Sequence, residues 1–190
     1  MYQKYTTEAL VLGAKESGEA DRTLLFYTRD FGLLRARGSA VRAENSKMRY
    51  AVQIYTRSFV SLVKGRRGWR AAGANAVHIA GRDPLGVSAF ARIAELTVRL
   101  VHGEEQNEYL FAALAEAHDA LMRDHVESFA TIEIVCVARV LYALGYLSAE
   151  ALETALFTHT AYAGEHLTEA EAMREKLLAS INRAIAQTQL

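Results

Sequence analysis

The chain has 190 residues, 51% of them hydrophobic, so it can bury a core as one large or two small domains. Its single cysteine excludes a disulfide framework and a multi-cysteine zinc site, and it is typical of a reducing compartment, so we expect a cytoplasmic protein. Residues 1–22 lack the apolar core of a signal peptide, and no run approaches the ~18 apolar residues that span a bilayer, so no membrane role is expected.

The formal net charge of zero hides two halves of opposite sign. Residues 1–73 hold 14 of the 22 Lys and Arg but 6 of the 22 Asp and Glu, which leaves 8 and 16 for the remainder. The halves therefore carry about +8 and about −8, whereas protein surfaces usually mix the two signs. We predict a basic domain over 1–80 and an acidic domain over 83–190, and nucleic acid is the commonest partner of a basic module.

Short runs with strand-like composition fill the first 80 residues. In the run after Gly32, Leu34 and Ala36 would face inward while Arg35 and Arg37 face solvent, because side chains alternate along a strand. Five short strands in about 80 residues favour a small barrel. The predicted strands cover 7–14, 23–28, 33–38, 49–63 and 69–79, with a loop or short helix over 39–47.

Asp83 and Pro84 mark the boundary to a helical region, because Asp is a favoured N-cap and proline a favoured first helical residue. Apolar residues then recur at helical spacing over 90–101, 110–122 and 129–144. The last of these stretches is apolar on nearly all sides, so we expect it at the centre of a helical bundle.

Four further positions carry helix-end signals. Gly145 is a plausible C-cap, and Ser148 can cap a short helix. Thr168 and Glu171 fit a capping box that would open the last helix. The expected fold class is therefore α+β, with a small N-terminal β-barrel followed by an all-α domain.

Basic residues gather around the third predicted strand, in the loop after it, and around the glycine-flanked turn GRRG. Side chains at such positions can line a groove along a phosphate backbone, whereas the plain alternative for each is a solvated surface. The candidate nucleic-acid-binding residues are Arg22, Arg35, Arg37, Arg42, Lys47, Arg49, Lys64, Arg66, Arg67, Trp69 and Arg70.

Aromatic residues are interleaved with these charges, namely Tyr27, Phe31, Tyr55, Phe59 and Trp69. Aromatic rings on a barrel face can stack unpaired bases, but at strand spacing they more often fill the core. Trp69 is the best stacking candidate because it adjoins the basic turn.

The sequence offers no pattern that predicts catalysis. It contains no glycine-rich phosphate loop, no Gly-x-Ser-x-Gly and no His-Glu-x-x-His. Cys136 lies in the most apolar stretch, as inert buried cysteines do, and His118 lies on an apolar stripe. His118 and His125, like His159 and His166, are seven residues apart with helix breaks expected between them. We predict no catalytic residue, no metal and no cofactor.

Several segments resemble, in order and spacing, the N-terminal domain of RecO, the bacterial recombination mediator. Near the other end, LYALGYL at 141–147 is similar to the leucine-rich helix ending in Leu-Gly-Tyr of many RecO proteins. The N-terminal segments are ALVL at 9–12, GEADR at 18–22, TRDFG at 28–32 and ARG at 36–38, with Arg42 and Ser46.

The resemblance implies an OB-fold barrel followed by a helical domain, in a non-enzymatic protein that binds single- and double-stranded DNA and anneals complementary strands. Such proteins act with RecR, and often RecF, to load RecA onto DNA coated by single-stranded-DNA-binding protein. The implied location is the bacterial cytoplasm, at the nucleoid. The family's basic DNA-binding face maps here onto Arg22, Arg35, Arg37, Arg42 and Lys47.

The sequence departs from the family pattern after residue 147. Many relatives carry a four-cysteine zinc lobe there, whereas this chain has Ser148-Ala149-Glu150, so it resembles a variant that lacks the lobe. The family's helical domain can receive the acidic tail of single-stranded-DNA-binding protein, which the acidic half here would repel unless basic residues such as Arg139 cluster. The alternative functions are an OB-fold module that binds RNA or a protein partner and, third, a hydrolase that uses Cys136 or a histidine.

Overall fold

The computed structural model of the chain describes residues 3–81, 83–123, 128–149, 152 and 154–188. It divides into two compact units, one formed by residues 1–80 and 102–108 and the other by residues 81–101 and 109–190. The short segment 102–108, which lies between two helices in the sequence, thus belongs to the first unit. Within the described residues, no helix is long and apolar enough to cross a membrane.

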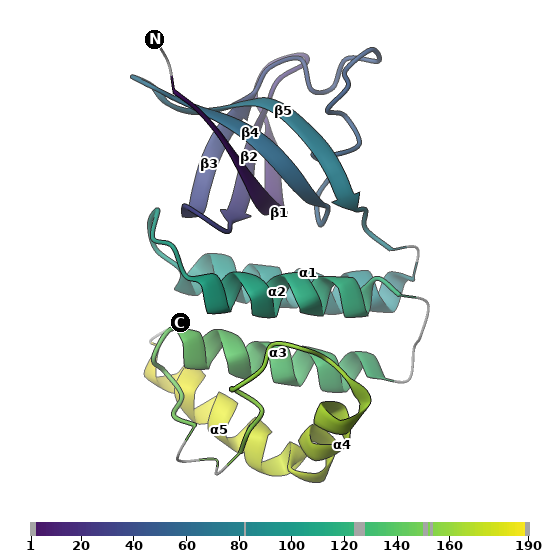
Figure 1. The fold of residues 1–190 in the computed structure, drawn as a ribbon, viewed down its shortest axis with the longest axis vertical. Coiled ribbons are helices and arrows are strands. Elements are labelled where there is room, and N and C mark those ends of the chain that lie inside the picture. Colours follow the sequence, from purple (N-terminus) through teal and green to yellow (C-terminus); the bar gives the residue numbers. More distant parts are fainter. Residues whose placement is uncertain (1–2, 82, 124–127, 150–151, 153, 189–190) are drawn as a thin grey trace. The chain divides into compact units, whose positions relative to one another are not determined.

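The first unit is a closed five-stranded barrel with the order β1-β2-β3-β5-β4 (Figure 1). β3 and β5 pair in parallel, and the other neighbours pair antiparallel. This OB-like barrel, followed by helices, confirms the predicted fold class. The strands are β1 (Lys4–Glu16), β2 (Arg22–Thr28), β3 (Gly32–Gly38), β4 (Arg57–Gly65) and β5 (Gly68–His78).

The barrel core follows from the period-two alternation of its strands. In β3, Leu34 and Ala36 are buried while Arg35 and Arg37 are exposed, as predicted. The buried core residues that the other strands supply include Ala9, Val11, Leu24, Phe26, Val60, Leu62, Trp69 and Ala71.

The strand predicted over 49–63 begins only at Arg57, so the prediction for 49–56 was wrong. Residues 39–56 form turns instead. The apolar residues that suggested a strand serve another purpose, because Ala51 and Val52 are buried in the barrel core from this loop. Tyr55 has a positive φ of 63°, and its N–H donates to the carbonyl of Val11 at 2.7 Å, which anchors the loop on β1.

Gly32 fixes the tight turn between β2 and β3. Its φ is +63°, a region that residues with a side chain rarely adopt, and a Cβ there would lie 2.1 Å from the carbonyl oxygen of Glu105. The turn therefore packs directly against the segment 102–108, which brings Glu104 of that segment within reach of Lys64.

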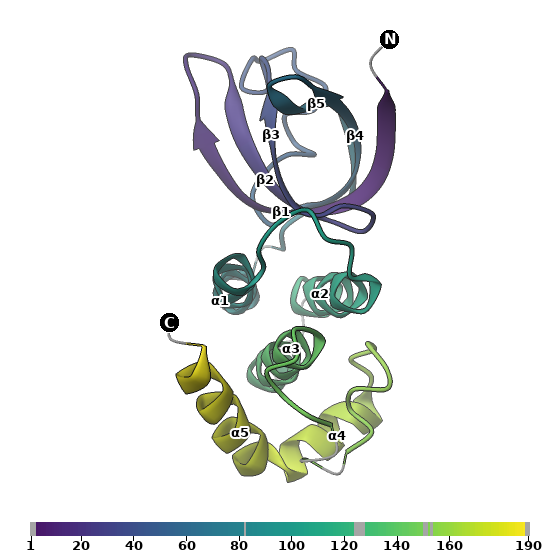
Figure 2. The same ribbon diagram turned by 90° about the vertical axis from the view of Figure 1, so that its left-hand side faces the viewer.

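The second unit consists of helices, of which α3 is the central one (Figure 2). As predicted for this apolar stretch, α3 contacts α1, α4 and α5. Asp83 caps α1 as expected, since its Oδ1 accepts a hydrogen bond from the Leu85 N–H at 2.8 Å. The helices are α1 (Pro84–Leu100), α2 (Glu108–Leu121), α3 (Phe129–Ala143), α4 (Gly164–Ala172) and α5 (Arg174–Gln187).

From the end of α3 onward, the observed helix ends agree with the sequence predictions only in part. Gly145 has a φ of +79° just after the C-cap of α3, as predicted. The capping box at Thr168 was wrong, because Thr168 lies inside α4 and its hydroxyl donates to the carbonyl of Gly164 at 2.8 Å. The short helix expected after Ser148 falls partly on residues 150–151 and 153, outside the described residues, and the described remainder contains turns.

Candidate nucleic-acid interface

Four basic residues lie in one row around the outer face of the barrel, and we call Lys4, Lys15, Arg37 and Arg70 the cationic row. All four side chains are exposed. Neighbouring strands are ~4.8 Å apart, so successive cations follow at one or two strand spacings, about 5 or 10 Å. The register that builds the row pairs Lys15 with Thr23, Thr23 with Arg37, Arg37 with Arg70, Arg70 with Val63 and Val63 with Lys4.

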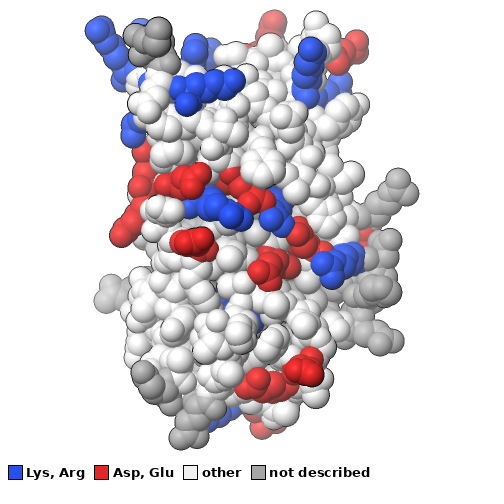
Figure 3. Space-filling view, viewed as in Figure 1, with Lys and Arg blue, Asp and Glu red and all other residues white. Residues whose placement is uncertain are grey.

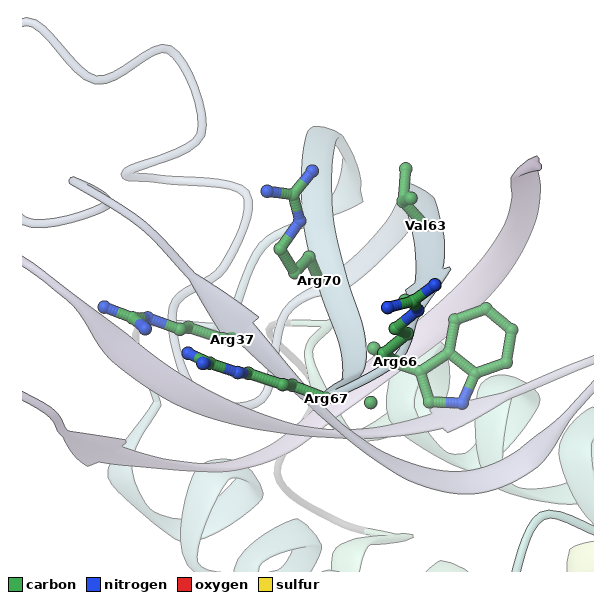
Figure 4. Close-up of a pocket in the computed structure, with 8 residues that line it drawn as sticks. Arg37, Val63, Arg66, Arg67 and Arg70 are labelled. Atoms are coloured by element: carbon green, nitrogen blue, oxygen red, sulfur yellow. The ribbon is translucent and has the colours of Figure 1, made fainter. Parts of the chain in front are cut away.

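A cavity of about 410 Å³ adjoins the centre of this row. Arg37 from β3, Arg70 from β5 and the two arginines of the β4–β5 turn, Arg66 and Arg67, line it. Figure 4 shows Arg37 and Arg67 extending in the same direction, although Arg37 comes from β3 and Arg67 from the β4–β5 turn. Figure 3 shows Lys and Arg side chains at the end of the barrel that carries the N-terminus. In OB-folds, the strand 2–3 face and the loop between strands 4 and 5 bind oligonucleotides.

Three of the predicted binding residues form ion pairs, namely Arg37, Arg42 and Lys64. Arg37 donates to Asp21 through Nη2 at 2.7 Å and Nε at 3.2 Å, and Arg42 lies 3.2 Å from Glu16. The backbone N–H of Ala40, at 2.8 Å, and then Arg37 hold the pKa of Asp21 below its ordinary value. The Arg37 side chain stays 62% exposed, so the pair leaves its guanidinium open to a ligand.

The other predicted barrel cations differ in position. Arg35 is exposed two residues before Arg37 on the same face of β3. Half-buried Arg22 begins β2, and the exposed Lys47 and Arg49 project from the loop 39–56. Within the described part of the chain, no ion pair involves Arg22, Arg35, Lys47, Arg49, Arg66, Arg67 or Arg70.

The Trp69 ring is enclosed by other side chains of the barrel, and Lys64 lies beside it. The Trp69 ring is 5% exposed, and its centroid lies 5.6 Å from that of Tyr5 and 5.2 Å from that of Phe31. Lys64 Nζ lies 4.9 Å from the Trp69 ring centroid and 2.9 Å from Glu104, whose pKa it lowers. The burial of Trp69 leaves no open ring face for a stacked base, in contrast to the sequence prediction.

Sequence reasoning missed Lys4 and Lys15, because a cation joins the row only through the pairing of strands distant in sequence. The register of the β1–β2 hairpin around the turn at Gly18 is the signal that could have found Lys15 opposite Thr23. Among the other aromatic candidates, Tyr27 is buried and Tyr55 half-buried, whereas Phe59 is 50% exposed.

The helical unit buries its candidate groups. Arg139 is 0% exposed, and its guanidinium donates to the carbonyls of Leu156 at 3.0 Å, Thr160 at 2.7 Å and Ala161 at 3.2 Å. Arg139 therefore cannot contribute to the basic surface cluster that, by the sequence argument, an acidic tail would need. Burial raises the pKa of Cys136 to about 11, which keeps the thiol protonated and unreactive.

The structure describes three of the four histidines that the sequence pattern singled out, His118, His159 and His166. His118 is fully buried on α2, with its ring centroid 5.0 Å from that of Phe90. The rings of His159 and His166 approach to 5.6 Å between centroids. His125, the other candidate of the sequence pattern, lies outside the described residues.

A closed five-stranded barrel with a cationic outer row is of the OB-fold class. Residues 1–71 match the family model described as the N-terminal domain of recombination protein O. Together with the similar proteins below, this match shows that the N-terminal part of the chain is similar to RecO proteins, in agreement with the resemblance seen in the sequence.

Three of the similar proteins are named DNA repair protein RecO. The one from Pelotomaculum thermopropionicum is 32% identical over 117 residues, 59% of this chain and 45% of that protein. The one from Desulforudis audaxviator is 45% identical over 64 residues, 34% and 26% of the two chains, and the one from Heliobacterium modesticaldum is 32% identical over 121 residues, 64% and 38%. The chain thus spans less than half the length of these curated relatives.

Proposed function

We propose that this chain acts in DNA repair and recombination by binding single- and double-stranded DNA along the cationic row and promoting the annealing of complementary strands. The observation that carries the proposal is the parallel pairing of Arg37 with Arg70, which joins cations from β1, β3 and β5 into one row beside a cavity lined by four arginines. The name of the relatives, DNA repair protein RecO, supports the choice of DNA.

The mechanism follows from the charge on DNA. Two strands repel each other, and a row of cations that neutralises phosphates releases condensed counterions and can hold both strands close. Phosphate contacts carry no sequence information, so the row would bind many sequences alike. The role requires no bond to be made or broken, and we propose no catalytic residue.

The finer role that we propose is to help load RecA onto DNA coated by single-stranded-DNA-binding protein. RecR, and in some settings RecF, would be partners, and the acidic tail of single-stranded-DNA-binding protein is a further candidate. This role would place the chain in the bacterial cytoplasm at the nucleoid. A pull-down of the full chain with RecR and with single-stranded-DNA-binding protein tests these partners.

The direct test is the salt dependence of binding to a labelled single-stranded oligothymidine between about 50 and 200 mM salt. Arg37→Ala with Arg70→Ala removes two phosphate contacts, so the slope of log affinity against log salt should fall by about 1.4. Arg99→Ala with Arg183→Ala is the matched control, because it removes the same charge from exposed positions of α1 and α5.

A slope of log affinity against log salt near zero for the wild type would contradict the proposed role of the cationic row. An equal fall of this slope in the control variant would contradict it as well. RNA of the same base sequence separates the proposal from its alternative, since clearly tighter binding of RNA would favour an RNA-binding module.

A further inference from the structure

The cavity of about 410 Å³ beside the cationic row is lined by four arginines, and none of the described residues that line it is acidic. Arg37 and Arg70 belong to the row, whereas Arg66 and Arg67 form the two-residue turn between β4 and β5. All four side chains are exposed. The volume lies within the range of about 300–1,000 Å³ that is usual for small-ligand sites, so a phosphate group and its sugar fit together.

The strand register brings these arginines to one place. Arg70 pairs with Arg37 on one side and with Val63 on the other, so the three side chains share the outer face of the barrel. The β4–β5 ladder continues for two more residue pairs, about 7 Å, and ends at the turn that carries Arg66 and Arg67. Two arginines thus lie off the row and line the same cavity as two of its members.

Most of this positive charge has no acidic partner. In the part of the chain that the structure describes, no ion pair involves Arg66, Arg67 or Arg70, while Arg37 contacts Asp21 at 2.7 Å. Four guanidiniums less one carboxylate leave a net charge of about +3 at the cavity. Guanidiniums that line one cavity repel one another, so an anion with more than one charge would relieve this repulsion.

The excess of charge indicates which phosphate fits. A phosphate inside a DNA strand carries one negative charge, whereas a phosphate monoester carries about −1.5 to −2 at pH 7 and offers three strong acceptor oxygens. The planar fork of arginine binds two such oxygens at once. The row already supplies cations for internal phosphates, and the added pair Arg66 and Arg67 matches a more highly charged group.

We propose that this cavity binds the terminal phosphate monoester of a DNA strand, with Arg66 and Arg67 contacting the phosphate while the cationic row holds the adjoining backbone. The inference rests on the proposed function and adds to it a preference for phosphorylated strand ends. Val63 gives the cavity an apolar wall against which the neighbouring sugar can pack. A 5′ end, a 3′ end and a free nucleotide share this chemistry, and the experiment separates them.

The test measures the affinity of the full chain for an oligothymidine of about eight nucleotides, within the ~4–16 that one OB-fold covers. Three forms are compared, one with a 5′-phosphate, one with a 3′-phosphate and one with hydroxyl groups at both ends. We expect at least one phosphorylated form to bind about tenfold more tightly than the hydroxyl form at about 50 mM salt, which corresponds to one charge-assisted contact.

Arg66→Ala with Arg67→Ala should abolish this preference while lowering the affinity for the hydroxyl form much less. Arg35→Ala with Arg49→Ala is the matched control, because it removes the same charge from exposed barrel positions that do not line the cavity. We expect the control to weaken binding of all three forms alike and to keep the tenfold preference.

Equal affinity of the wild type for the three forms would overturn the inference, as would a preference that survives Arg66→Ala with Arg67→Ala or is also lost in the control. Displacement of a phosphorylated oligothymidine by an equal concentration of free thymidine monophosphate would overturn it too, because the cavity would then bind nucleotides and not strand ends. If the three forms bind equally while Arg37→Ala with Arg70→Ala lowers the salt slope, the strand-end site fails and the proposed function stands. A salt slope near zero for the wild type contradicts both.

Discussion

The two units of this chain use arginine in opposite ways. In the barrel, Arg37 and Arg70 are exposed on the outer face, where strand pairing places them side by side. In the helical unit, Arg139 is fully buried and donates hydrogen bonds to three main-chain carbonyls of the segment 156–161. Its guanidinium also lies 4.6 Å from the ring centroid of Tyr162.

The difference shows how burial decides what a charge can do. An exposed cation adds little to folding stability but can meet a phosphate, whereas a buried one cannot meet a ligand and instead satisfies polar groups that folding has removed from water. Net charge alone does not separate these uses, because Arg139 counts in the sequence like any surface arginine.

The largest effect on stability is expected for Arg139→Met, which leaves one buried and two partly buried main-chain carbonyls without their donor. We predict that the free energy of unfolding of the helical unit falls by about 3 kcal/mol or more, as measured by circular dichroism during unfolding in urea. Fluorescence of Trp69, which reports the barrel, should shift much less. Arg183→Met on the exposed face of α5 is the control, and a helical transition equal in both variants would contradict this role of Arg139.

Next in size is Gly32→Ala in the β2–β3 turn. The new Cβ would clash with the carbonyl of Glu105 and the positive φ would be strained, so the barrel should lose more than about 2 kcal/mol in the Trp69 transition. Gly18→Ala has a similar φ of +85° with no atom within 4 Å of the added Cβ, and it should cost only about 1 kcal/mol. Equal losses would show that segment 102–108 does not pack against the turn.

A smaller effect concerns Cys136 and pH. Burial raises its pKa from 9.0 to about 11, so its contribution to stability is full below pH 9 and is lost as pH rises toward 11. We expect a thiol reagent at pH 8 to label the native chain far more slowly than the chain in denaturant. Equal labelling rates would show that the core of the helical unit is open.

The smallest effect is expected for Asp21→Asn. It removes the carboxylate that competes with phosphate for Arg37, so single-strand affinity should rise by about two- to fivefold at low salt. In the wild type the same gain should appear as pH falls through the lowered pKa of Asp21, below 3.8. Asp30→Asn in the β2–β3 turn is the control; a fall in affinity of Asp21→Asn would mean that Asp21 positions Arg37 for binding.

The sequence predicted what local patterns determine. The alternation of Leu34 and Ala36 with Arg35 and Arg37 gave the two faces of β3, and Asp83 before Pro84 gave the start of α1. These features depend on residues within one element, so the local sequence pattern was sufficient to predict them.

Tertiary contacts decided the rest. Residues with strand propensity around Val52 became a loop that fills the barrel core, and Thr168 bonds within α4 instead of opening a helix. The burial of Trp69 depends on Tyr5 and Phe31 from other parts of the barrel. Lys4 and Lys15 join the cationic row only through strand register, which the sequence alone did not reveal.

The most direct measurement of the central claim is lysine footprinting of the full chain by limited acetylation and mass spectrometry, with and without a single-stranded oligothymidine. If DNA lies along the cationic row, Lys4 and Lys15 become protected, while Lys176 on α5, which bonds the carbonyl of Leu152, reacts at an unchanged rate. Equal acetylation of Lys4 and Lys15 with and without bound DNA would contradict the account.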